Sequence, residues 1–192
     1  MYTEGAMTSI KLLETPLTQA KLKKLRVGQR ILISGFVYTA RDAAHKRLTD
    51  AIDAKENLPI PIDGQIIYYA GPSPTRPGEI IGSAGPTTAT RVDVYTPKLL
   101  TNGLKGMIGK GYRTPEVRME MQKHGAVYFV TVGGAAALIS QTITEVKIIA
   151  YEDLGTEAIR RLRVEDFPVL VANDLYGDDL FESGRNQYKR EQ

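Results

Sequence analysis

The chain has 192 residues, of which 42% are hydrophobic and 24% are charged, so it is long enough for one globular domain and is not typical of a disordered protein. Its 25 basic and 22 acidic residues leave a net charge of +3, too diffuse for the dense basic stripe of a nucleic-acid-binding protein. The absence of cysteine excludes disulfides, thiol nucleophiles and a thiolate-held metal cluster on this chain. Two histidines are too few for a conventional zinc site.

The sequence indicates neither a membrane span nor a signal peptide, and it predicts one domain between two short end segments. No apolar run approaches the roughly 18 residues of a membrane-spanning helix, and residues 1–10 lack the basic start and apolar stretch of a signal peptide. We therefore expect a cytoplasmic protein that contacts no membrane. Residues 1–11 are expected to form a leader or extension, residues 12–181 a single domain, and residues 182–192 a polar tail.

The first third of the chain predicts a strand, a helix and a second strand. Gln29–Thr39 is rich in apolar residues, which predicts a strand interrupted at Gly35. Thr39-Ala-Arg-Asp42 resembles a capping box with Asp in place of the usual Glu or Gln, so a helix is expected from there to about Lys55. Gln65–Ala70 then predicts a short buried strand.

The stretch from Gly71 to Thr90 is dense in Gly, Pro, Ser and Thr. Its Gly and Pro residues each fix a turn, and a loop of this length inside a compact domain is usually either functional or disordered. The regular punctuation favours an ordered loop with a function. Apolar residues recur at helical spacing from Val92 to Leu100, which predicts a helix that ends at Gly103.

The second half of the chain predicts more strands and helices in alternation, with the last residues, from about Gly177, at the periphery. Strands that alternate with helices indicate a layered α/β domain. The predicted elements are a strand at Gly106–Gly109, a helix opened by Pro115 and closed by Gly125, a strand at Ala126–Val132, a Gly133-Gly134 turn, a helix at Ala135–Ile139, and strands at Thr142–Tyr151 and Phe167–Ala172.

Two arginines stand where a helix dipole disfavours a positive charge. Arg41 and Arg91 each fall in the first turn of a predicted helix. The free N–H groups of a helix N-terminus, together with a guanidinium group, suit a carboxylate or a phosphate. The alternative is a surface arginine folded back onto an acidic neighbour such as Asp42 or Asp93. The sequence leaves both interpretations open.

Two adjacent threonines precede Arg91 in the segment Gly85-Pro-Thr-Thr-Ala-Thr-Arg91. A threonine after a turn is a common helix N-cap, but only one of Thr87 and Thr88 is needed for that role. One hydroxyl is therefore spare. A hydroxyl is a poor base unless another base or a strong local field assists it.

A lysine lies between two glycines in Gly109-Lys-Gly111, at the end of a predicted strand. A P-loop is excluded, because Leu104 stands where that motif needs a glycine and Gly111 replaces the residue that binds magnesium. Lys110 can still reach into a cleft as a point charge, or it can be an ordinary exposed lysine. His45, one helical turn after Arg41, is expected to pack or to cap.

Two arginines, a lysine and a hydroxyl describe a pocket for a small dicarboxylate. The motifs that carry these residues occur in the same order as in a known family. From about Leu12 to Phe181, the chain resembles the β subunit, or C-terminal domain, of class I fumarases and L(+)-tartrate dehydratases. Thr90 stands where that family often has Gly, without changing the spacing. The matching motifs are Ala40-Arg-Asp-Ala-Ala-His45, Gly71-Pro72, Gly85-Pro-Thr-Thr-Ala-Thr-Arg91, Gly109-Lys-Gly111 and Gly133-Gly-Ala-Ala-Ala137.

The resemblance implies a swivelling β/β/α fold and an active site completed by a second subunit. That α subunit holds a [4Fe-4S] cluster on its cysteines, and this chain binds no cofactor or metal alone. By motif position, Arg41 and Arg91 bind the substrate carboxylates, Thr87 transfers a proton and Lys110 adds a catalytic charge. The implied assembly is a heterotetramer of two α and two β subunits, and the implied reaction is the reversible hydration of fumarate to malate.

Two alternatives to this function follow from the same residues. Tartrate can replace malate as the substrate, because much of the pocket belongs to the partner. A non-catalytic dicarboxylate-binding module would keep the pocket without the reaction. Nucleic-acid binding would require a strongly salt-dependent affinity, and the diffuse charge argues against it. A neighbouring reading frame with three cysteines would favour the enzyme.

Overall fold

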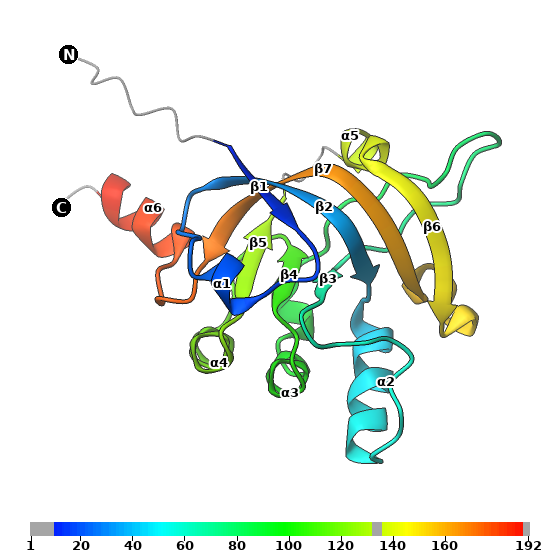
Figure 1. Cartoon of the computed structure of the whole chain (residues 1–192), viewed down its shortest axis with the longest axis horizontal. Helices are drawn as coiled ribbons and strands as arrows, with labels where there is room; N and C mark the ends of the chain where they lie inside the picture. The colour runs from blue at the N-terminus through cyan, green and yellow to red at the C-terminus, as the bar shows by residue number, and fades with distance from the viewer. Residues whose placement is uncertain (1–9, 132–135, 190–192) are drawn as a thin grey trace.

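A computed structural model describes residues 10–131 and 136–189 of the chain (Figure 1). The turn predicted at Gly133-Gly134 lies outside the described residues. The strands are β1 (Lys11–Glu14), β2 (Arg30–Thr39), β3 (Ile66–Tyr68), β4 (Gly106–Gly109), β5 (Val127–Val130), β6 (Ile143–Ala150) and β7 (Ile159–Asn173). The helices are α1 (Gln19–Leu22), α2 (Asp42–Asp53), α3 (Thr96–Thr101), α4 (Pro115–His124), α5 (Ala136–Gln141) and α6 (Leu180–Tyr188), with 3₁₀ turns η1 (Ala89–Val92) and η2 (Glu152–Glu157).

Five of the strands in the described part of the chain close into a barrel. Strands β2, β3, β4 and β5 lie side by side and parallel, and β7 pairs antiparallel with both β5 and β2, which closes the ring. Strand β1 extends the sheet beside β2, and β6 extends it beside β7. A parallel row closed by an antiparallel strand confirms the α/β class and adds a barrel that the sequence did not predict.

The two long strands, β2 and β7, are bent, and each pairs with three other strands. Strand β2 pairs with β1, β3 and β7, and β7 pairs with β2, β5 and β6. Their register shifts between Ile33 and Gly35, where Gly35 has a φ of +114°. A Cβ atom on Gly35 would lie 2.3 Å from the Thr15 hydroxyl oxygen, which accepts a hydrogen bond from the Phe36 N–H. Only glycine fits both the backbone conformation and this close approach.

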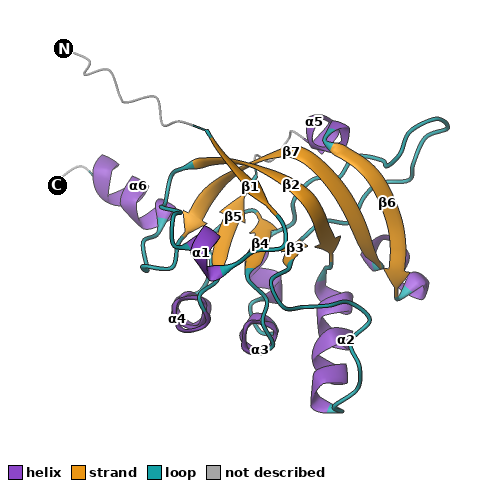
Figure 2. Ribbon diagram, in the orientation of Figure 1, coloured by secondary structure: helices purple, strands orange, loops and turns teal. Residues whose placement is uncertain are grey.

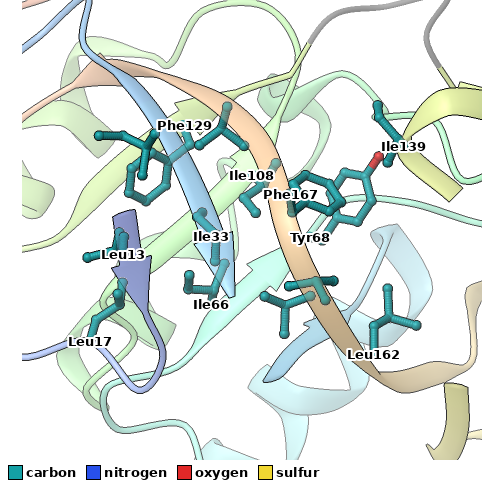
Figure 3. Close-up of a cluster of buried hydrophobic side chains, with 14 of the residues drawn as sticks. Leu13, Leu17, Ile33, Ile66, Tyr68, Ile108, Phe129, Ile139, Leu162 and Phe167 are labelled. Carbon is teal, nitrogen blue, oxygen red and sulfur yellow. The ribbon is translucent and has the colours of Figure 1, made fainter. Parts of the chain in front are cut away.

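Apolar side chains fill the interior of the barrel (Figure 3). Every strand of the ring contributes to this cluster, and the Tyr68 ring meets the Phe167 ring edge to face at 5.2 Å. The Tyr68 hydroxyl is not left unpaired there, because it donates to the Ala84 carbonyl at 2.5 Å. Members of the interior cluster are Leu13, Leu17, Ile33, Ile66, Tyr68, Ile108, Phe129, Ile139, Leu162 and Phe167.

A second core lies between the outer face of the parallel strands and a layer of helices. Figures 1 and 2 show α4, α3 and α2 in a row along one side of β5, β4 and β3. Side chains alternate along each strand, so that Ile67, Met107 and Tyr128 face this layer while their neighbours face the barrel interior. Strands β3 and β4 are therefore buried on both faces, as is usual for parallel strands covered by helices.

Most of the predicted elements are confirmed, but the capping box at Thr39 and the start of the last strand are not. Thr39 does not open α2 with a capping box, because it is the last residue of β2 and its hydroxyl accepts a hydrogen bond from the Arg160 N–H at 3.0 Å. Arg41 occupies the N-cap position instead, without a side-chain cap bond of its own among the described residues. Strand β7 begins at Ile159, well before the predicted Phe167.

The loop between β3 and η1 projects from the body of the molecule (Figure 2). Its outer part, residues 73–80, is exposed. The predicted helix that follows is divided into η1 and α3, and Gly103 takes the expected positive φ of +102° just after it. Among the described helices, none is both long enough and apolar enough to cross a membrane.

Candidate functional site

The candidate residues follow the carboxyl ends of neighbouring parallel strands. Arg41 comes two residues after β2, and Lys110 comes directly after β4. Gly71 ends the short link after β3, which lies between these two strands. Because parallel strands end at the same edge of a sheet, their following segments converge there, as they do in parallel barrels and in open α/β sheets. We call this region the carboxyl edge.

Backbone hydrogen bonds attach Thr87 and Lys110 to this edge. The Lys110 N–H donates to the Thr87 carbonyl at 3.1 Å, and the Ala89 N–H donates to the Lys110 carbonyl at 2.9 Å. The Thr87 N–H and hydroxyl both donate to the Tyr69 carbonyl, at 2.7 and 2.9 Å. Gly109 is required beside them, since a Cβ there would lie 2.8 Å from the Tyr69 ring. The structure therefore brings the predicted threonine and lysine together.

Neither threonine caps a helix through its side chain within the described residues. Thr88 holds the N-cap position of η1 but makes no cap bond, and it is exposed. Thr87 is half-buried and uses its hydroxyl to fasten the loop to the end of β3. The N-cap alternative for these hydroxyls is therefore wrong, and Thr87 is the threonine that the fold holds in place.

A single carboxylate links the two arginines. Asp42 Oδ1 accepts from Arg91 Nε at 3.1 Å, and Asp42 Oδ2 lies 4.0 Å from Arg41 Nη2. Both arginines are thus folded onto acidic neighbours, which was one of the two interpretations of the sequence. The contact to Arg91 engages only Nε, and the Arg91 side chain is 57% exposed. Its two terminal amino groups have no hydrogen-bond partner among the described residues and still offer a fork for a second carboxylate.

Arg41 is more enclosed than Arg91. Its side chain is 21% exposed and passes close to Gly71, where a Cβ atom would lie 2.8 Å from Nη1. The nearest carboxylate oxygen is Glu157 Oε1, 3.5 Å from Nη2. Arg41 Nε is buried with no hydrogen-bond partner among the described residues. The guanidinium group is therefore held in a narrow slot with its charge balanced by acidic groups.

His45 supports Arg41 from inside the protein. It is fully buried, and its Nδ1 lies 2.9 Å from the Arg41 carbonyl, which also accepts the His45 backbone N–H at 2.8 Å. Burial lowers the pKa of His45 to about 4, so the ring is neutral and Nδ1 is the donor. This confirms the structural role expected for His45.

A buried arginine that the sequence did not single out lies under the carboxyl edge. Arg113 Nη2 pairs with Asp93 Oδ1 at 2.8 Å and also donates to the Thr96 hydroxyl, while Nη1 donates to the Tyr69 hydroxyl. Asp93 additionally accepts the Thr114 N–H at 2.8 Å. This network joins the β4–α4 connection to α3 and to the residue that anchors Thr87. No hydrophobic periodicity indicates that Arg113 is buried, and a charged residue between Tyr112 and Thr114 is typical of an exposed loop.

Above this buried support, the exposed Arg91 and Lys110 and the partly buried Arg41 and Thr87 form a charged surface that is open to solvent. Lys110 is exposed, and its side chain makes no hydrogen bond or ion pair with any part of the chain that the structure describes. The described residues also contain no group of three or more His, Asp or Glu side chains that could hold a metal ion. The surface can bind a small anion with several carboxylates, and it can place a hydroxyl and an ammonium group beside it.

The sequence matches known proteins over nearly its whole length. Residues 2–184 match the family model described as the fumarase C-terminus. The chain belongs to this family. Among family members, "Fumarate hydratase class I, anaerobic" from Escherichia coli is 41% identical over 165 residues, covering 85% of this chain and 30% of that protein. "Fumarate hydratase 2" from Leishmania major is 36% identical over 179 residues, covering 91% and 32%.

A further relative of the fumarase C-terminal family is similar in length to this chain. The "Putative L(+)-tartrate dehydratase subunit beta" from Methanocaldococcus jannaschii is 34% identical over 172 residues, covering 86% of this chain and 88% of that protein. The chain thus spans about a third of the fumarate hydratases but most of the tartrate dehydratase subunit. These matches confirm the resemblance seen in the motifs.

Proposed function

We propose that the chain is the β subunit, or C-terminal part, of an iron–sulfur hydro-lyase that reversibly hydrates fumarate to malate. The observation that carries the proposal is the pair of arginines, Arg41 and Arg91, joined through Asp42 on the carboxyl edge that also presents Thr87 and Lys110. Two guanidinium groups suit the two carboxylates of a four-carbon acid. The names of the fumarate hydratase relatives support the choice of reaction.

Each residue has a proposed role that fits its surroundings. Arg91 offers its terminal amino groups, which no described residue engages, to one carboxylate, and Arg41, held in its slot, binds the other. Lys110 supplies a further positive charge to the dianionic substrate. Thr87 is the proposed proton-transfer group, because the Tyr69 carbonyl holds its hydroxyl in place and the positive charges of Lys110 and the two arginines on the same edge favour loss of its proton. The open surface is consistent with a site that a second subunit completes.

The residues of this chain do not fit an iron–sulfur cluster, since the sequence has no cysteine. The proposal therefore assigns the [4Fe-4S] cluster to a cysteine-bearing α subunit, where it supplies a Lewis acid for the substrate hydroxyl. A heterotetramer of two α and two β subunits and a cytoplasmic location belong to the same proposal. So does the swivelling β/β/α description of the fold, which is supported by the two cores on either face of the parallel strands and the layer formed by α2, α3 and α4.

Tartrate is the second candidate substrate. The M. jannaschii relative that is similar to this chain in length carries the name of a tartrate dehydratase subunit. Tartrate and malate are both hydroxylated four-carbon dicarboxylates, so the arginine pair suits either. The residues that would distinguish them contact the substrate between its carboxylates, where the partner contributes.

The test is to co-express the chain with its cysteine-bearing partner without oxygen and to assay malate and tartrate dehydration. We expect turnover of at least one substrate, and a loss of about 10-fold or more in kcat/KM for Arg91→Lys, because an ammonium group cannot grip a carboxylate with two parallel hydrogen bonds. Wild-type complex with no turnover of either acid would overturn the hydro-lyase assignment. Near-normal kinetics for Arg91→Lys would show that Arg91 is structural.

A further inference from the structure

We propose that Glu157, at the end of η2 in the connection between β6 and β7, is a positioning residue for Arg41. This inference rests on the proposed function, in which Arg41 binds a substrate carboxylate. Glu157 is separated from Arg41 by more than half the chain, and neither a motif nor a periodicity connects them. Its position beside Arg41 is a result of the fold.

One carboxylate makes two contacts at the start of α2. Glu157 Oε2 accepts the Ala43 N–H at 2.9 Å, and Glu157 Oε1 lies 3.5 Å from Arg41 Nη2. The first contact caps a free N–H of the helix, which the Arg41 side chain does not do among the described residues. The second contact sets the direction of the guanidinium group. The first turn of α2 and the side chain of Arg41 are therefore contacted by the same residue.

The connection that carries Glu157 is itself held firmly. Arg160 donates to the carbonyls of Gly155, Thr156 and Ala158 at 2.8, 3.2 and 3.1 Å. Its backbone N–H donates to the Thr39 hydroxyl at the end of β2. Three carbonyls converging on one guanidinium group fix the shape of the turn. Glu157 therefore presents its carboxylate from a rigid support.

Arg41 has few other ways to keep its orientation. On one side a Cβ at Gly71 would collide with Nη1, so the slot has no spare room there. The other carboxylate, Asp42, lies farther away at 4.0 Å and is already engaged by Arg91. Glu157 is thus the nearest acidic group and the one that decides how Arg41 faces the carboxyl edge.

The test compares three variants in the complex of this chain with its α subunit. Glu157→Gln keeps an acceptor for the Ala43 N–H and removes the ion pair, and Glu157→Ala removes both. Asp153→Asn is the matched control, because Asp153 lies on the same connection and contacts Arg47 of the same helix without touching Arg41. For each variant, KM, kcat and melting temperature are measured.

We expect Glu157→Gln to melt like the wild type and to raise KM about 10-fold with a small change in kcat, the pattern of a lost binding contact. Glu157→Ala should raise KM at least as much and also lower the melting temperature, while Asp153→Asn keeps the wild-type KM. A Glu157→Gln complex with wild-type KM would overturn the proposal. Glutamine still accepts the Ala43 N–H, so a wild-type KM would mean that Glu157 serves only to cap α2.

The proposed function can fail separately from this inference, because it fails when the wild-type complex has no turnover. In that case the Arg41 side-chain N–H resonance is followed by NMR in the full chain. Glu157→Gln should shift this resonance, and Asp153→Asn should leave it in place. An unchanged Arg41 resonance in Glu157→Gln would overturn the positioning role.

Discussion

Two polar side chains near the carboxyl edge, Thr87 and His45, direct their hydrogen bonds to backbone carbonyls. Thr87 bonds the Tyr69 carbonyl at the end of β3, and His45 bonds the Arg41 carbonyl at the start of α2. Each bond fixes a segment that carries a candidate site residue. At the scale of single residues, the site is therefore built by groups that hold the backbone as well as by groups that face a ligand.

The role of Thr87 can be separated from its structural bond. Thr87→Ala should lower turnover of the reconstituted complex by roughly 100-fold or more if the hydroxyl transfers a proton, and the lost bond to Tyr69 should cost about 1 kcal/mol of stability. Thr87→Ser, which keeps a hydroxyl, should restore much of the turnover. Thr88→Ala is the control, because the exposed Thr88 hydroxyl makes no such bond within the part of the chain that the structure describes. Kinetics and melting temperatures check both points, and normal turnover in Thr87→Ala would exclude proton transfer by this residue.

The buried His45 should make stability depend on pH. Its pKa is about 4 in the folded chain against an ordinary value of 6.5, so between these values the unfolded chain binds a proton that the folded chain does not. This contribution to stability is complete above pH 6.5 and is lost as the pH falls toward 4, by up to about 3 kcal/mol. His45→Asn keeps a donor for the Arg41 carbonyl and does not titrate. The free energy of unfolding, measured with urea across this pH range, should vary less with pH for the variant than for the wild type. An equal loss of stability in both proteins would show that His45 is not the titrating group.

At the scale of elements, the site depends on how closely α2 approaches the link after β3. Gly71 is the point of contact, because a Cβ there would lie 2.8 Å from Arg41 Nη1 and 3.1 Å from the Thr156 carbonyl oxygen. The backbone of Gly71 does not have a positive φ, so its lack of a side chain matters for space alone. The Gly71-Pro72 motif is thereby explained by a neighbour that is distant in sequence.

Gly71→Ala should therefore disturb Arg41 without straining the backbone. Overfilling a tight contact costs about 1–3 kcal/mol, and displacement of the guanidinium group should raise KM for a dicarboxylate in the complex. Gly184→Ala is the control, since a Cβ at this position in α6 meets nothing within 4 Å. Melting temperature and KM are the measurements. A Gly71→Ala complex with unchanged KM would show that the slot around Arg41 is loose.

At the scale of the whole molecule, the charged residues lie on an open surface of a chain that spans about a third of its fumarate hydratase relatives. Arg91 and Lys110 are exposed, and the arginine charges are balanced by Asp42 and Glu157. A surface of this kind can bind a dianion weakly in water, where ion pairs are screened. Strong binding of the dianion needs a second surface that excludes water from its ion pairs with the arginines.

The purified chain should accordingly be folded, colourless and inactive. We expect a cooperative melting transition, no visible absorption after incubation with iron and sulfide, and no turnover of malate, fumarate or tartrate, because the chain has no cysteine thiolate to hold a cluster. Addition of the cysteine-bearing partner should produce both colour and activity. Turnover by the chain alone would contradict the division of labour between the subunits.

The sequence by itself determined the features that depend on near neighbours. The apolar runs located β3, β4 and β5. Thr114 caps the start of α4, and Gly125 takes the left-handed conformation that ends this helix. The ordered motifs identified the family, and the apolar run at Gly106–Gly109 placed Lys110 at the end of a strand. Such features follow from backbone preferences and side-chain spacing over a few residues, which the sequence displays directly.

Only the tertiary structure decided which distant groups meet. The first half of β7 is rich in arginine and does not read as a strand, yet pairing with β2 and β6 on both sides stabilises it. The same closure brings Glu157 to Arg41 and leaves Thr39 at the end of a strand. Arg113 is buried against Tyr69, Asp93 and Thr96, which come from other parts of the chain. Closing a barrel joins segments that are far apart along the chain, and the energy of those contacts depends on three-dimensional proximity, which local sequence patterns do not contain.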